Sequence, residues 1–304
     1  MRVRGRQVVA WVAGALMLAG PAQAGTPQPV VASGVQEWEP AAADGFLAWA
    51  RTSTEHPRHF DVVVRSGGEI HRVNPRRSAA AHPSIDLANP HLGDVVALSL
   101  GRNVHGDRRW DLAYFDLQTG ARIPGPPGLN TDRSERQPSI SGDHLLFARR
   151  NDDGGSNDAV LLYDLSEDSI TKLDTARNGV ANAGAVNGDW VTWQKCGPSA
   201  CKVFRHQLSA GNTTRLRTAA PILWSPTIAS DGTVFLVRSG HDCGQRSRIL
   251  GVPVDGRTTT VAAFAPGVDA SDLYIHEHDG DVDLYFSRVT CDDFDLDVYR
   301  ISDV

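Results

Sequence analysis

One pattern of hydrophobic and polar positions recurs along the chain after residue 24. Each copy has a polar-edged run that usually opens near a Pro, a Gly or Gly-Asp turn, an apolar run, a polar loop and a further apolar run. The turn glycines are Gly45, Gly93, Gly142, Gly188, Gly232 and Gly280. Their spacings are 48, 49, 46, 44 and 48 residues. A period of this length is typical of propeller blades.

Each copy supplies four short runs with strand character. The third run is rich in aromatic and β-branched residues, as in 111–117, and a fourth follows a turn, as in 169–173. No useful helical period occurs after residue 24. A β-sandwich is the alternative, but it does not predict six similar units at nearly equal spacing. We therefore expect an all-β, six-bladed β-propeller with four antiparallel strands per blade.

The two ends of the chain are expected to meet in the last blade. The sixth copy stops after its third strand, at residues 297–302, so its fourth strand must come from elsewhere. The segment 29–33 has strand character and precedes the first blade at the distance seen for other fourth strands. It is predicted to complete the sixth blade and close the ring, which removes an open sheet edge.

The first 24 residues have the features of a secretory signal peptide. Arg2, Arg4 and Arg6 precede an apolar run over 8–20, and Ala22-Gln23-Ala24 is a small-residue cleavage site. The expected organisation is a signal peptide over 1–24 and a single propeller domain over 25–304. The apolar run is too short for a transmembrane helix, so no stable membrane anchor is expected. The mature protein is predicted to be secreted or periplasmic.

Charge excludes one class of partner. The chain has 304 residues and a formal net charge of −6, and removal of the signal peptide takes three arginines with it. The mature chain keeps 27 basic residues against 36 acidic ones, a net charge of about −9. Nucleic acid is therefore not expected as a partner, because its binding depends on clustered positive charge. The mature protein is expected to be a monomer.

The four cysteines all lie in the second half of the chain, and an oxidising compartment permits disulfides. Cys196 and Cys201 enclose four residues at one hairpin mouth, whereas Cys243 and Cys291 occupy equivalent loops of neighbouring blades. We predict bonds between Cys196 and Cys201 and between Cys243 and Cys291. Ion pairs are also predicted across the open ends of hairpins. They join Arg51, Arg149 and Arg288 to aspartates at the start of the third strands, including Asp61 and Asp158.

Serine-nucleophile chemistry is not expected. The string closest to the Gly-x-Ser-x-Gly turn of serine hydrolases is Gly197-Pro-Ser199-Ala-Cys201, which lies in a hairpin loop and ends in Cys. The catalytic residues, if any exist, are unknown from the sequence.

Two strings suggest metal ligands. His276 and His278 are two apart on a first strand, so they face the same way and line the channel, as His82 does in the second blade. A catalytic metal site needs at least three protein ligands, and only two imidazoles can be placed on this strand. Asn151, Asp153 and Asn157 loosely resemble a calcium loop, in a place where Asp-Gly turns are ordinary. We therefore expect no bound metal and no cofactor, and interpret these histidines as polar channel residues.

The repeat resembles the TolB-type six-bladed β-propeller family. The resemblance rests on Gln137-Pro-Ser-Ile-Ser-Gly142-Asp-His-Leu-Leu-Phe147-Ala-Arg149 and on Trp224-Ser-Pro226-Thr-Ile-Ala-Ser-Asp231-Gly232-Thr-Val-Phe-Leu-Val-Arg238, and it extends over 26–304 as a pattern. These motifs imply a propeller blade and not an activity, and the resemblance does not extend to the extra N-terminal α/β domain that TolB carries. Related propellers include pectin-fragment lyases with a His-x-His pair among their metal ligands.

The sequence thus favours a protein- or glycan-binding module or scaffold of the cell envelope or extracellular space, with the partner at the propeller face. The alternative is a metal-assisted polysaccharide lyase or hydrolase that uses the propeller channel. The protein is expected not to be an enzyme.

Overall fold

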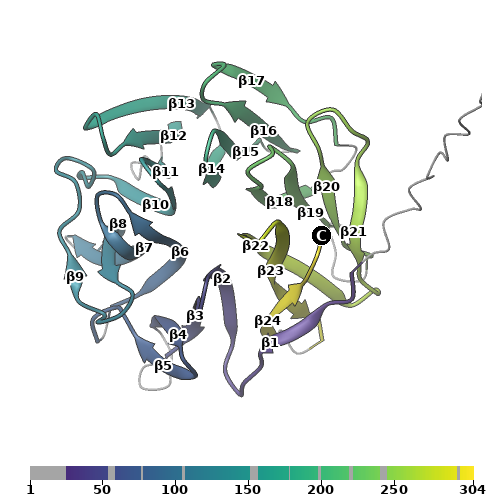
Figure 1. The fold of residues 1–304 in the computed structure, drawn as a ribbon, viewed down its shortest axis with the longest axis horizontal. Coiled ribbons are helices and arrows are strands. Elements are labelled where there is room, and N and C mark those ends of the chain that lie inside the picture. The colour runs from purple at the N-terminus through teal and green to yellow at the C-terminus, as the bar shows by residue number, and fades with distance from the viewer. Residues whose placement is uncertain are drawn as a thin grey trace, which may run out of the picture.

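The fold is built from antiparallel hairpins that succeed one another around a central axis (Figure 1). In this computed structural model the described residues are 25–53, 59–76, 78–104, 107–150, 157–177, 179–197, 200–218, 222–239, 245–292 and 295–304. They contain 24 strands in six four-stranded sheets. The predicted all-β six-bladed propeller is confirmed. Within the described residues no helix is long and apolar enough to cross a membrane.

The first three blades follow chain order from the centre outward. Their strands are β2 (Glu37–Ala43), β3 (Phe46–Thr52), β4 (Phe60–Ser66) and β5 (Glu69–Arg72); β6 (Ala80–Asn89), β7 (Gly93–Val104), β8 (Asp107–Asp116) and β9 (Arg122–Ile123); β10 (Ser134–Ser141), β11 (His144–Arg150), β12 (Asn157–Asp164) and β13 (Ser169–Arg177).

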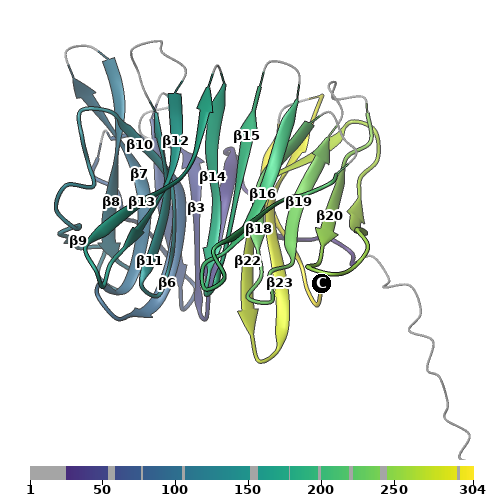
Figure 2. The same ribbon diagram turned by 90° about the horizontal axis from the view of Figure 1, so that it is seen from above.

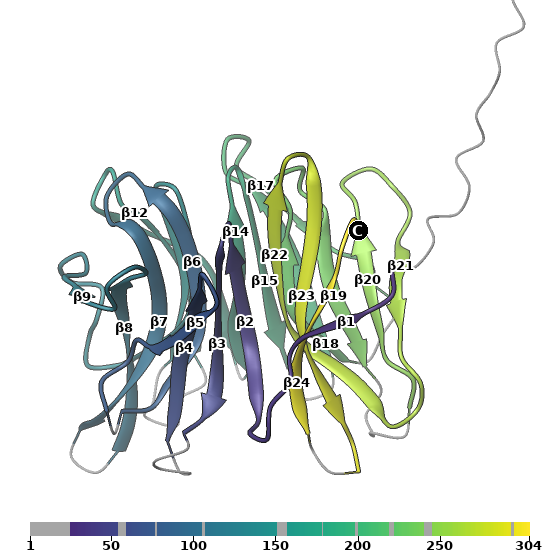
Figure 3. The same ribbon diagram turned by 60° about the horizontal axis from the view of Figure 1, so that its bottom comes forward.

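The other three blades complete the ring. Their strands are β14 (Val180–Asn187), β15 (Trp190–Cys196), β16 (Cys201–Gln207) and β17 (Asn212–Arg215); β18 (Ile222–Ile228), β19 (Val234–Ser239), β20 (Arg248–Val252) and β21 (Thr259–Ala263); β22 (Val268–His278), β23 (Asp281–Thr290), β24 (Leu296–Ile301) and β1 (Gln28–Val31). Side views show the sheets standing around the axis (Figures 2 and 3).

The repeat glycines lie in the turns between first and second strands, or directly beside them. All six have φ between 53° and 91°, a left-handed conformation that glycine adopts without steric penalty. This explains why the period of the sequence coincides with the period of the blades.

The core lies between neighbouring sheets. One buried cluster joins Val62 and Val64 of blade 1 to Val96, Leu98 and Phe115 of blade 2, and comparable clusters occupy other junctions. Alternate residues of the second and third strands thus pack against the next blade. The closed ring buries both faces of most sheets, so every blade depends on its neighbours.

The predicted ring closure is confirmed. Strand β1 pairs antiparallel with β24, with Gln28 opposite Arg300 and Val31 opposite Val298. Figure 1 shows the two strands next to each other in blade 6. Arg65 of blade 1 also donates a hydrogen bond to the Val30 carbonyl oxygen, 3.2 Å away. The signal-peptide prediction falls on residues 1–24, which lie outside the described residues.

One predicted disulfide is confirmed, between Cys196 and Cys201 across the β15–β16 hairpin. Cys291 is disulfide-bonded. Cys243 lies outside the described residues, so its pairing with Cys291 stays a prediction.

The predicted ion pair between Arg149 and Asp158 in blade 3 is wrong. Arg149 Nε lies 2.8 Å from Glu135 Oε1, and it is Arg150 that contacts Asp158, at 3.2 Å. Adjacent residues of a strand face opposite ways, so Arg149 points inward to the fully buried Glu135. In blade 1, Arg51 lies opposite Asp61 in the ladder as predicted, but the ion pair of Asp61 is with Arg72, at 3.7 Å.

Candidate functional site: the central channel

The first strand of every blade contains a β-bulge near the channel. In blade 1, Trp38 pairs with Ala50 and Ala41 with Ala48, so two residues of β2 oppose one of β3. The register shifts at the equivalent place in the other five blades. A bulge bends its strand and changes the direction of a side chain. The six bulges therefore form a ring around the axis.

Four bulges hold a polar residue in the left-handed region. Glu39, His82, Gln137 and Asp272 have φ of 53°, 54°, 55° and 53°. For a residue that is not glycine, such a conformation costs on the order of 1–3 kcal/mol and is concentrated at functional sites. In three of these blades the next residue is a proline, which suits a bulge position because it needs no ladder N–H donor.

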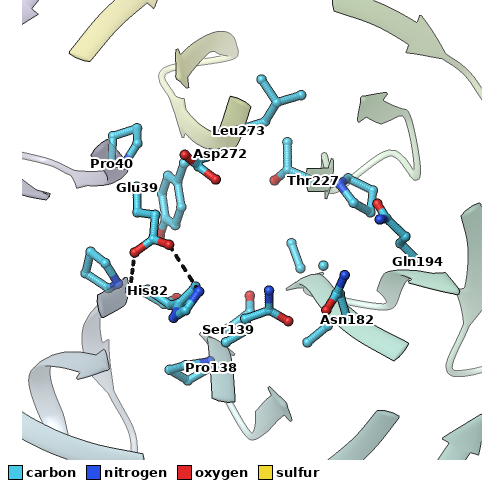
Figure 4. A pocket seen from close by; sticks show the side chains of 18 residues that line it. Glu39, Pro40, His82, Pro138, Ser139, Asn182, Gln194, Thr227, Asp272 and Leu273 are labelled. Atoms are coloured by element: carbon cyan, nitrogen blue, oxygen red, sulfur yellow. Dashed lines mark hydrogen bonds and ion pairs between the residues drawn. The ribbon is translucent and has the colours of Figure 1, made fainter. Parts of the chain in front are cut away.

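These side chains line a cavity of about 280 Å³ to which all six blades contribute. Figure 4 shows Glu39, His82, Asp272, Asn182, Gln194 and Thr227 arranged around it. No Lys or Arg is among the described residues that line this cavity. The channel at this level therefore presents carboxyl, amide, hydroxyl and imidazole groups.

Glu39 and His82 are joined across two blades. The His82 backbone N–H donates to Glu39 Oε2 at 2.6 Å, and His82 Nε2 lies 3.1 Å from Glu39 Oε1. Burial raises the pKa of Glu39 to about 7 and lowers the pKa of His82 to about 4. His82 is thus neutral at pH 7. The contact is a hydrogen bond from Nε2–H to the carboxyl group, and Nδ1 is left as an acceptor.

Asp272 is held from its own blade. Burial, followed by the negative charge of Glu39, raises the pKa of Asp272 to about 6. The hydroxyls of Ser271 and Ser287 donate to its Oδ2 at 2.8 and 3.0 Å. Ser287 Oγ also accepts the Glu39 N–H at 2.9 Å. This fully buried serine therefore fixes two members of the ring at once.

Two buried atoms at the cavity have unused hydrogen-bonding capacity. Gln194 is 1% exposed, and its Nε2 donates to Cys196 Sγ at 3.0 Å. Gln194 Oε1 and His82 Nδ1 have no hydrogen-bond partner among the described residues. A buried polar atom without a partner is unfavourable by about 1–3 kcal/mol, so such atoms indicate a place for a ligand donor.

The other end of the channel is also acidic. A second cavity, again of about 280 Å³, is lined by Asp44, Asp86, His276 and Glu277 among others, and no Lys or Arg is among its described lining residues. Five of the six turns between first and second strands carry an aspartate: Asp44, Asp143, Asp189, Asp231 and Asp279. Negative charge thus surrounds this mouth.

The candidate residues from the sequence are dispersed. His82 belongs to the bulge ring. His276 lies at the opposite mouth, where its Nε2 is 2.9 Å from Asp44 Oδ1, and His278 Nε2 is 3.3 Å from Asp283 Oδ2. Asn151 and Asp153 lie outside the described residues, and Asn157 is described only through its backbone in β12.

Most of the polar residues that line the first cavity are absent from the candidates that the sequence suggests. Glu39, Gln137, Asp272 and Gln194 are not among them, although a signal for two was present: Glu39 and Gln137, like His82, directly precede a repeat proline. Asp283, which lies beside His276 and His278, is also absent from the candidates that the sequence suggests.

Comparison with known proteins shows the fold. No family model matches the sequence, and no curated protein matches it. Putative TolB from Agrobacterium tumefaciens is similar in structure, with a TM-score of 0.60 and 14% identity over 89% of this chain and 91% of that one. TolB from Acinetobacter baumannii gives a TM-score of 0.54 and 15% identity over 85% of this chain.

This chain spans 63% of the Acinetobacter protein. A chain of a nidogen/laminin complex is also similar, with a TM-score of 0.52 and 8% identity over 87% of this chain and 92% of that one. At these identities the likeness concerns the fold alone. The fold of this chain is therefore that of the TolB-like six-bladed β-propellers.

Proposed function

We propose that this protein is a secreted or periplasmic binding module whose central channel receives a cationic group, a Lys or Arg side chain, from a protein partner. The observation that carries the proposal is the ring at the bulges, where strained residues direct carboxyl and acceptor groups into a cavity whose described lining has no Lys or Arg. The Cys196–Cys201 disulfide and the signal-peptide pattern support the compartment.

The chemistry of the ring suits a cation with several N–H donors. An ammonium group offers three donors and a guanidinium five, and neither accepts a hydrogen bond. The cavity offers the carboxylates of Glu39 and Asp272 together with the unpartnered Gln194 Oε1 and His82 Nδ1. A cation bound among these groups donates hydrogen bonds to the acceptors that it reaches, and its charge stabilises the ionised carboxylates.

The same charge argues against a uronic-acid polysaccharide in the channel. Such a chain carries one carboxylate per sugar, and the described lining of both cavities offers carboxylates without a Lys or Arg. The hydroxyls of a neutral glycan can donate hydrogen bonds to the carboxylates, but they supply no positive charge to balance them. A basic peptide is therefore the preferred ligand over the polysaccharide of the enzyme alternative.

The test is fluorescence anisotropy at about pH 8, above the raised pKa values of the ring, with labelled Lys-rich, Glu-rich and Gly-Ser peptides and a neutral chito-oligosaccharide. The Lys-rich peptide is expected to bind, with Kd about tenfold or more higher in Glu39→Gln/Asp272→Asn because two charge-assisted contacts are lost.

The matched control is Asp132→Asn/Asp292→Asn, which removes the same charge from exposed positions away from the cavity. Equal loss of binding in both double variants would attribute the affinity to net charge and refute the channel site. Binding of the chito-oligosaccharide alone would favour a glycan partner instead.

A further inference from the structure

A cluster of side chains away from the bulge ring has the composition of a metal site. The hairpin of β22 and β23 extends past the turns of the other blades (Figure 2). His276 and His278 project from the same face of β22, with ring centroids 5.0 Å apart. In the ladder His276 lies opposite Asp283 of β23. The register of this hairpin thus adds a carboxylate to the two imidazoles.

The three side chains are close enough to share one ion. One ligand atom from each of His276, His278 and Asp283 lies within 4.8 Å of the others. Ligand atoms around a tetrahedral zinc ion, at about 2.0–2.1 Å from the metal, are roughly 3.3 Å apart. Small rotations of side chains therefore suffice. In the described part of the chain no other group of three His, Cys, Asp or Glu side chains meets this criterion.

Blade 1 supplies a fourth donor. Asp44, in the turn between β2 and β3, has Oδ1 2.9 Å from His276 Nε2 and a side chain that is 76% exposed. The Asp44 side chain can therefore rotate toward an ion, because little packs on it. Asp44 and Asp283 together bring two carboxylates to the imidazoles, and their negative charge balances that of a divalent cation.

Asp283 is held in place by a neighbour on β24. Its side chain is 5% exposed, and Arg300 Nη1 lies 3.4 Å from Oδ2. Arg300 is itself 44% exposed, so its guanidinium can adjust its position when an ion binds to the carboxylate. Hydrogen bonds of this kind orient metal ligands, and their removal weakens metal affinity about 10–100-fold.

We propose that His276, His278 and Asp283 bind a divalent transition metal of the zinc class, and that Asp44 completes the site. Imidazole and carboxylate ligands in this number fit tetrahedral Zn²⁺. The ion connects blade 6, which contains both ends of the chain, to blade 1. The expectation of no bound metal rested on the two ligands that one strand supplies, and the fold brings the others to them.

The chain contains a natural control. His91 Nε2 lies 2.8 Å from Asp143 Oδ1, and this pair connects blade 2 to blade 3 on the same face. It has the same two residue types as His276 and Asp44. Among the described residues it does not belong to a three-ligand cluster. Replacement of His91 therefore tests the loss of an inter-blade histidine without loss of the proposed site.

The experiment uses untagged protein treated with a chelator and titrated with Zn²⁺ by calorimetry, with bound metal counted by mass spectrometry. Wild type and His91→Ala are expected to bind one ion per chain, whereas His276→Ala and His278→Ala lose stoichiometric binding. Asp44→Asn is expected to raise Kd about tenfold. An unchanged Kd for Zn²⁺ in Asp44→Asn would show that Asp44 is not a ligand and would refute the connection of blade 6 to blade 1 through the ion.

Two further measurements keep the proposal testable if a variant folds poorly. Co²⁺ bound to the wild-type protein is expected to show the visible bands of a tetrahedral site, and saturating Zn²⁺ is expected to raise the thermal midpoint by about 5 °C. Absence of stoichiometric metal in the wild-type protein, or equal binding in the His276→Ala/His278→Ala double variant, would overturn the proposal. Whether or not metal binds at the histidine cluster, the proposal of peptide binding in the bulge ring is unaffected.

Discussion

Glu39 is expected to destabilise the folded protein at neutral and alkaline pH. Its pKa is raised from 4.5 to about 7 by burial, so the folded state holds this proton more tightly than the unfolded state does. The contribution of the bound proton to stability is therefore fully present below about pH 4.5 and is lost as pH rises through 7. Glu39→Gln replaces the group by an uncharged near-isostere of its protonated form.

The magnitude follows from the two pKa values. A difference of about 2.5 between the folded and unfolded states corresponds to about 3 kcal/mol, at about 1.4 kcal/mol per pH unit. The amide of the Glu39→Gln variant still offers an oxygen to the His82 N–H, so the main bond across the two blades is kept. The variant is therefore expected to match wild type at about pH 4.5 and to exceed it by about 3 kcal/mol at about pH 8.

The assay is urea unfolding followed by tryptophan fluorescence at both pH values. Buried Trp49 and Trp193 report the loss of the core. His82, whose lowered pKa makes wild type less stable as pH falls from about 6.5 to about 4, is present in both proteins, so its own titration largely cancels in the difference. A stability difference that is flat between the two pH values would refute the argument. A gain in stability together with lost peptide binding would show that Glu39 serves function at the expense of stability.

Three other features give separate predictions. Deletion of residues 25–34 removes β1 and exposes β24, so we expect aggregation or a large loss of stability, visible in gel filtration and thermal melting; a monomer with an unchanged midpoint would contradict the closure argument. Glu135 is fully buried against Arg149, so Glu135→Gln is expected to reduce the free energy of unfolding by about 3 kcal/mol in urea titrations, whereas a change below about 1 kcal/mol would show that the pair behaves as an exposed one. Non-reducing peptide mapping is expected to recover Cys243 joined to Cys291, and recovery of Cys196 joined to Cys243 would refute the pairing.

The architecture could be predicted because its causes are local. Each blade carries a glycine that the turn after its first strand requires, and the alternation of apolar residues in the following strand determines which faces are buried. Counting strands showed that the last blade lacked one, and the segment near residue 29 supplied it. None of these steps needed knowledge of contacts between blades.

The bulge ring depended on the closed structure. Glu39, His82 and Gln137 are each separated by about one blade in the sequence, and they face one cavity only because six blades close around it. The repeated proline marks the bulge, but the left-handed backbone that directs the preceding side chain inward results from the pairing of strands. The raised pKa of Glu39 likewise follows from burial, which no local pattern encodes.

The proposed metal site contains one ligand that the sequence could have identified and one that only the closed ring reveals. A two-residue turn at Asp279-Gly280 places His278 opposite Asp281 and therefore His276 opposite Asp283, so hairpin geometry alone could have identified the third ligand. Asp44 could not have been identified in this way, because it lies more than 200 residues away in another blade. Local register is determined by the turn residues in the sequence, whereas contact between the first and last blades exists only in the closed ring.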